Sequence, residues 1–70
     1  MPTERVVSDV RAKIGAGELV PGDHLPAVPD MAKDYGVSRT TILKALAILR
    51  DDGLVYTVPR WGTFVAERKG

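Results

Sequence analysis

Hydrophobic residues at three- and four-residue steps predict that the chain begins with an amphipathic helix. We expect this helix to run from about Thr3 to Ala16, with Thr3 as its N-terminal cap. Gly15 and Gly17 then end the helical pattern. The stripe that would face a core comprises Val6, Val7, Val10 and Ile14.

The connection from Glu18 to Val28 is expected to be ordered. Pro21-Gly22-Asp23 is typical of a turn. Apolar residues on both sides of this turn are expected to enter the core: Leu19, Val20 and Leu25. Leu25 can also pair with a later strand.

Two further helices are expected to form a helix-turn-helix. The first runs from about Pro29 to Tyr35, because proline suits a first turn and the apolar residues fall on one side. Gly36 then supplies the left-handed conformation that ends one helix just before the next begins. The second runs from about Ser38 to Asp52 and ends at Gly53, with an apolar face made of Ile42, Ala45, Leu46 and Leu49.

Two β-prone runs follow the helices and predict a hairpin. They are Leu54–Val58 and Thr63–Ala66, on either side of the turn Pro59-Arg60-Trp61-Gly62. Three helices followed by a two-stranded wing are the arrangement of a winged helix-turn-helix, a mainly α fold with a small β-hairpin. Because 70 residues hold only one small core, we expect residues 1–70 to be a single such domain, with no effector domain among them.

The start of the third expected helix combines residues suited to a DNA groove. Ser38 can cap the helix by accepting a hydrogen bond from a first-turn N–H, and such helix starts favour anions such as phosphate. Arg39 offers a planar set of donors for guanine or phosphate, and Thr40 and Thr41 offer hydroxyl and methyl groups. Lys44, one turn later, is placed for a phosphate contact.

Composition narrows the compartment and the partner. The chain has no cysteine, which excludes disulfides and thiolate chemistry and favours a reducing cytoplasm. No apolar run approaches the roughly 18 residues of a membrane span. The net charge of +1 is weak support for a nucleic-acid partner, but residues 38–70 carry six Lys/Arg and three Asp/Glu, whereas residues 1–37 carry four and six. The positive half therefore contains the expected recognition helix.

Several ordered segments, which together cover nearly the whole chain, resemble the N-terminal DNA-binding domain of GntR-type bacterial transcription regulators. They are Leu19–Pro26, Met31-Ala32, Tyr35–Thr41, Ala45-Leu46, Gly53–Val55 and Gly62–Val65. The resemblance implies that Ser38, Arg39, Thr40 and Thr41 contact operator phosphates and bases. It also implies that the wing turn ending at Gly62 approaches the minor groove.

This chain departs from the family pattern at positions that bear on DNA contact. Similar proteins often have arginine where this chain has Pro29, and many have arginine or another polar residue at Leu43. The wing turn often has glycine where this chain has Arg60, and a basic or polar residue where it has Trp61. Lys44 and Arg60 can compensate for the missing charge.

Each candidate residue also has a purely structural interpretation. Ser38 can act only as a cap, and one of the two threonines can serve the first helical turn rather than DNA. We favour DNA contact for Arg60, because a cation at a wing tip suits the minor-groove potential, and packing against the sheet for Trp61. His24 has no second histidine or cysteine at ligand spacing, so neither a metal nor another cofactor is expected.

The sequence therefore favours sequence-specific binding of double-stranded DNA by a transcription regulator, expected to be a repressor. The resemblance implies a homodimer on DNA, with dimerisation and effector binding assigned to a separate C-terminal domain rather than to these residues. The alternative is a protein-interaction module that uses the hairpin surface and Trp61. An enzyme is not expected, because no nucleophile, base and pocket can be assembled from these residues.

Overall fold

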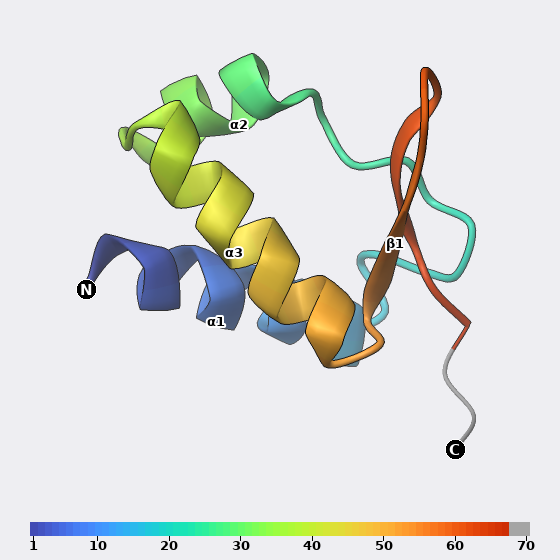
Figure 1. Ribbon diagram of the computed structural model, residues 1–70. Helices are drawn as coiled ribbons and strands as arrows, with labels where there is room; N and C mark the ends of the chain where they lie inside the picture. Colours follow the sequence, from blue (N-terminus) through green and yellow to red (C-terminus); the bar gives the residue numbers. More distant parts are fainter. Residues whose placement is uncertain (68–70) are drawn as a thin grey trace.

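The computed structural model describes residues 1–67, which form three helices and one two-stranded antiparallel sheet (Figure 1). The elements are α1 (Pro2–Gly15), α2 (Val28–Tyr35), α3 (Arg39–Asp51), β1 (Val55–Val58) and β2 (Gly62–Val65). Their order is the one predicted, and each lies within one or two residues of its expected bounds. None of the helices in this part of the chain is both long and apolar enough to cross a membrane.

Helix α1 begins one residue earlier than expected. Met1 is the N-cap residue, and its carbonyl accepts a hydrogen bond from the Arg5 N–H at 3.1 Å. The prediction that Thr3 caps the helix was wrong, because Thr3 lies inside the first turn and no side chain caps this end. Pro2 suits the first helical position, where its missing N–H would have had no partner within the helix.

The helix-turn-helix forms as predicted. Gly36 ends α2 with φ +67° and ψ +35°, which is the left-handed conformation that glycine adopts without steric cost. The Val37 N–H then donates to the Ala32 carbonyl at 3.0 Å, so the turn stays tied to α2. Ser38 adopts an extended conformation and begins α3 as its N-cap.

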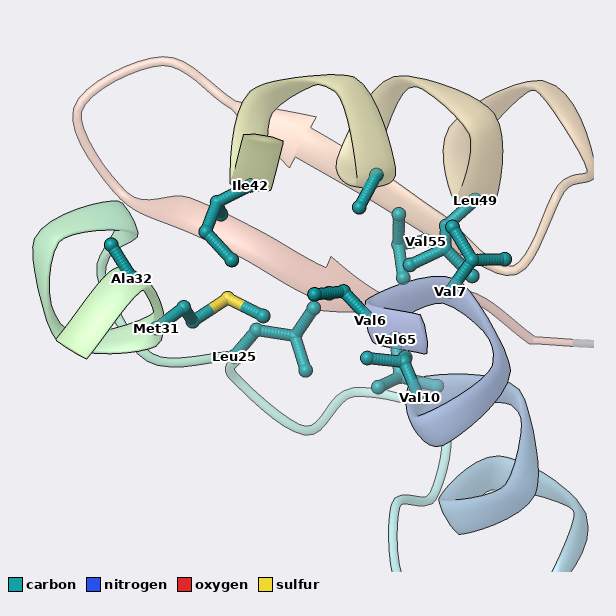
Figure 2. Close-up of a cluster of buried hydrophobic side chains, with 11 residues drawn as sticks. Val6, Val7, Val10, Leu25, Met31, Ala32, Ile42, Leu49, Val55 and Val65 are labelled. Carbon is teal, nitrogen blue, oxygen red and sulfur yellow. The ribbon is translucent and has the colours of Figure 1, made fainter. Parts of the chain in front are cut away.

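A single cluster of buried apolar side chains joins all five elements (Figure 2). Its centre is the inner face of α3, where Ile42, Ala45 and Leu49 are fully buried. The other members come from α1, α2, the connection and the two strands: Val6, Val7, Val10, Leu25, Met31, Ala32, Val55 and Val65. The apolar stripes predicted for α1 and for α3 therefore pack against one another.

The connection between α1 and α2 adds a third chain segment to the hairpin. β1 and β2 pair from Val55 with Val65 to Val58 with Gly62, and His24 forms an isolated bridge with Phe64 on the other edge of β2. The Leu25 N–H donates to the Thr63 carbonyl at 2.8 Å, which confirms that Leu25 pairs with a later strand. Leu25 is also buried as expected, whereas Val20 is exposed and was wrongly assigned to the core.

A polar network holds α1 against the end of α2. The Tyr35 hydroxyl donates to Asp9 Oδ2 at 2.5 Å, and Lys13 Nζ lies 3.2 Å from the same oxygen. The hydrogen bond from Tyr35 holds the pKa of Asp9 below its ordinary value, helped by Lys13 and opposed by partial desolvation. Arg5 adds a hydrogen bond to the Tyr35 carbonyl at 2.6 Å.

Truncating a buried leucine of α3 should destabilise the domain far more than truncating an exposed one. Leu49→Ala removes a fully buried side chain and should lower the free energy of unfolding by about 2–5 kcal/mol. Leu43→Ala, the same change on the exposed face of the same helix, should alter it by no more than about 0.5 kcal/mol. Urea denaturation followed by circular dichroism measures both, and equal losses would contradict this core.

Tyr35→Phe should weaken the acid sensitivity of the fold. The pKa of Asp9 is lowered in the folded chain, so its ionised form favours folding above the unfolded value of about 4. That contribution is lost as the pH falls from about 5 through the lower folded pKa. Without the phenol, unfolding free energies measured across this range should fall less steeply. Tyr56→Phe, an exposed tyrosine on β1 outside this network, is the control and should keep the parent slope.

Candidate nucleic-acid interface

The N-terminus of α3 is held by hydrogen bonds between its cap and its first turn. The Thr41 N–H donates to Ser38 Oγ at 3.1 Å, and the hydroxyls of Ser38 and Thr41 hydrogen bond to each other at 3.0 Å. Thr41 is half-buried, whereas Thr40 is exposed. Of the two threonines, Thr41 is therefore the one that serves the helical turn.

The outer face of the same helix start carries two cations. Arg39 and Lys44 are exposed on the first and second turns, on the side of α3 opposite the core. Thr40 and Leu43 lie between them on the same face, and Leu43 is 57% exposed. The unpaired N–H groups and the positive end of the helix dipole add to this field, so the surface is suited to an anion such as a phosphate.

The hairpin turn places Arg60 in a conformation that normally belongs to glycine. The Trp61 N–H donates to the Val58 carbonyl at 3.0 Å, which closes a four-residue turn with Pro59 in second position. Arg60, in third position, has φ +72° and is the only non-glycine residue with positive φ among residues 1–67. Proline followed by positive φ is the pattern of a type II turn, and a side chain there costs about 1–2 kcal/mol. The guanidinium is exposed at the tip.

His24 positions this turn from outside the hairpin. Its Nε2 donates to the Trp61 carbonyl at 2.9 Å, and its ring lies 5.0 Å from the Phe64 ring, centroid to centroid. Gly62, with φ +113°, is required beside it, because a Cβ at this position would lie 2.4 Å from His24 Nε2. Sequence reasoning missed this role: the contact joins residues 37 positions apart, and no local pattern indicates it.

The expectation that Trp61 packs against the sheet was wrong. Its side chain is 73% exposed. The aromatic contacts on the sheet instead join Phe64 to His24, at 5.0 Å between ring centroids, and to Tyr56, at 5.7 Å. Trp61 therefore projects from the tip next to Arg60.

The helix start and the wing tip lie on the same side of the domain. In Figure 1 the beginning of α3, all of α2 and the hairpin turn occupy the upper part of the view, while α1 lies below them. Pro29 is exposed in the first turn of α2. Within residues 1–67, no group of three or more His, Cys, Asp or Glu side chains is placed to hold a metal ion. The start of α3, which carries Arg39 and Lys44, and the hairpin turn, which carries Arg60, therefore share one side of the domain.

Comparison with known proteins identifies the family. The profile described as "Bacterial regulatory proteins, gntR family" matches residues 2–65. The chain belongs to the GntR family. Its three helices and wing are the winged helix-turn-helix domain of that family, as predicted.

Curated relatives within the GntR family are longer than this chain. The histidine utilization repressor of Klebsiella aerogenes is 40% identical over 67 residues, which is 96% of this chain and 28% of that protein. The transcriptional repressor NagR of Bacillus subtilis is 35% identical over 65 residues, 93% of this chain and 27% of its own length. The chain therefore spans just over a quarter of the length of these relatives.

Solved structures similar to this GntR domain include DNA complexes. The N-terminal domain of AraR, in complex with mutant ORR3, has a TM-score of 0.91 at 35% identity over 94% of each chain. The DNA-binding domain of AraR in complex with operator ORR3 has a TM-score of 0.89 at 35% identity, covering 93% of this chain and 78% of that one.

The backbone at position 60 should favour glycine over alanine. Arg60→Ala keeps a side chain at positive φ, whereas Arg60→Gly removes the strain, although glycine also makes the unfolded chain more flexible. The glycine variant should be the more stable of the two by about 1 kcal/mol, the reverse of their order in a helix. Thermal melts of both variants test this, and an alanine variant of equal or higher melting temperature would contradict the left-handed turn.

Proposed function

We propose that this chain is the DNA-binding domain of a bacterial transcription repressor that acts on double-stranded operator DNA in the cytoplasm. Helix α3 enters the major groove, and the hairpin tip lies near the minor groove. The observation that carries the proposal is the start of α3, where a capped helix presents Arg39, Thr40 and Lys44 on one exposed face. A major groove about 12 Å wide admits a helix presented in this way.

The six polar candidates and Gly62 have distinct roles in this proposal. Arg39 and Thr40 read base edges, and Lys44 and Arg60 contact phosphates or the minor groove, since all four are exposed. Ser38 and Thr41 hold the helix start through their mutual hydrogen bond and reach phosphate through the first turn. Gly62 lets the wing turn lie against His24.

The relatives support a binding role rather than an enzymatic one. Both curated relatives described above are named as repressors, and the DNA-binding domain of AraR has been solved in complex with an operator. Since such regulators use symmetric half-sites, we propose that the full protein binds DNA as a homodimer. We assign effector recognition to a part of the full protein outside residues 1–70, because the relatives extend well beyond the segment that matches this chain.

The exposed Trp61 supports a second candidate function, a protein-interaction surface on the wing. A large aromatic side chain that is 73% exposed is an effective anchor for a protein partner. The DNA proposal has more support, because it also accounts for the capped start of α3 and for the exposed cations Arg39, Lys44 and Arg60.

Titration of the domain onto a fluorescently labelled random-sequence duplex, read as anisotropy at several salt concentrations, separates the two functions. A DNA-binding domain should lose affinity linearly on a log–log plot of binding against salt, with a slope near −0.9 per phosphate neutralised. Absence of binding even at low salt would contradict DNA recognition and favour the protein-interaction surface.

Arg39→Ala should cost about 1–3 kcal/mol at a selected operator, or roughly 5- to 150-fold in affinity, with less effect on random DNA. The reason is that Arg39 supplies base discrimination as well as charge. Arg50→Ala, an exposed arginine in the last turn of the same helix, is the matched control and should stay close to the parent. Equal losses in the two variants would remove Arg39 from the base-reading role.

A further inference from the structure

Leu43 is an apolar side chain on the face of α3 that otherwise carries polar groups. It is 57% exposed, whereas the helix buries Ile42, Ala45 and Leu49 completely. A single exposed leucine is ordinary on a protein surface. Leu43 differs from the other exposed apolar residues because Arg39, Thr40 and Lys44 surround it on the exposed face.

Leu43 lies one helical turn farther along α3 than Arg39 and Thr40, the two residues proposed to read base edges. It follows Arg39 by four residues and Thr40 by three, so it lies about 4.5–6 Å farther along the helix axis on the same face. Helical side chains lean toward the N-terminus, so Leu43 leans toward Thr40. Since base pairs are about 3.4 Å apart, Leu43 reaches bases within about two base pairs of those near Arg39.

The chemistry of leucine leaves one suitable partner on the floor of the major groove. Leucine can neither donate nor accept a hydrogen bond, so against guanine, cytosine or adenine it would cover polar edges without replacing their water. Thymine alone presents a methyl group there, at C5. A leucine against this methyl removes apolar surface of both partners from water.

We propose that Leu43 is a specificity-determining residue that contacts the C5 methyl group of a thymine in the operator. The inference rests on the proposed function, because it requires α3 in the major groove. The proposed contact gives the chain a preference for thymine opposite Leu43, where a hydrogen-bonding side chain would instead read guanine or adenine. Ile48 is also exposed on α3, at 40%, but it is five residues from Leu43 and faces another direction.

Removal of single methyl groups from the DNA tests this contact. An operator is first selected from a random duplex library, and each thymine is then replaced in turn by deoxyuridine, which lacks only the C5 methyl. One replacement, within two base pairs of the position that Arg39→Ala affects, should weaken binding of the parent domain about three- to tenfold. The same replacement should leave the affinity of Leu43→Ala unchanged.

Two controls separate the possible outcomes. Ile48→Ala should keep the parent's sensitivity to the missing methyl, and circular dichroism should show that Leu43→Ala is folded. The proposal is overturned if the preferred operator has no thymine at these positions, if no replacement weakens binding, or if Leu43→Ala remains as sensitive as the parent. These results leave DNA binding itself intact, whereas a parent domain that binds no duplex would overturn the proposed function as well.

Discussion

The structure depends on burial of the inner face of α3. Ile42, Ala45 and Leu49 are fully buried and are packed against by α1, α2 and the sheet, so the rotation of α3 about its own axis has little freedom. Once these three positions face inward, the 100° step of the helix decides what faces outward, namely Arg39, Thr40, Leu43 and Lys44. The apolar core thus determines which residues of α3 a partner can contact, although these outward residues are not part of the core.

A separate constraint orients the wing. An isolated two-stranded hairpin is marginally stable in water, and here the connection between α1 and α2 pairs with the free edge of β2. The Leu25 N–H binds the Thr63 carbonyl at 2.8 Å, and His24 binds the carbonyl of Trp61 at 2.9 Å. Leu25 is itself part of the core, so the hairpin tip is linked to the same packing that holds α3. The helix start and the wing tip are consequently both connected to one core, on the same side of the domain.

Local signals in the sequence were sufficient for most of the fold but for only part of the site. Gly36 and Ser38 act through their own backbone and immediate neighbours, so the helix-turn-helix was predictable from the pattern. The Thr3 cap failed because Pro2 can start a helix without any side-chain cap. The exposure of Trp61 and the role of His24 were not predictable, because both depend on which rings fill the sheet surface after the chain has folded. The hydrogen bond between the Ser38 and Thr41 hydroxyls was predictable only in part. The sequence allowed either threonine to serve the first helical turn, and the folded geometry selects Thr41.

The separation of core and contact surface has a consequence for how recognition can vary within this family. In a chain of 70 residues nearly every buried position is needed for stability, whereas the exposed side chains on the outward face of α3 contribute little to it. Substitution at those positions can therefore change the exposed surface without unfolding the domain. Leu43 is such a position, because its side chain is 57% exposed. Arg60 is exposed as well, but it carries its charge at a backbone position suited to glycine. Arg60 adds conformational strain of about 1–2 kcal/mol, a cost that a folded domain tolerates only if its core is intact. Because the buried face of α3 is fixed by the core, the exposed face of the same helix is free to carry side chains of different chemistry.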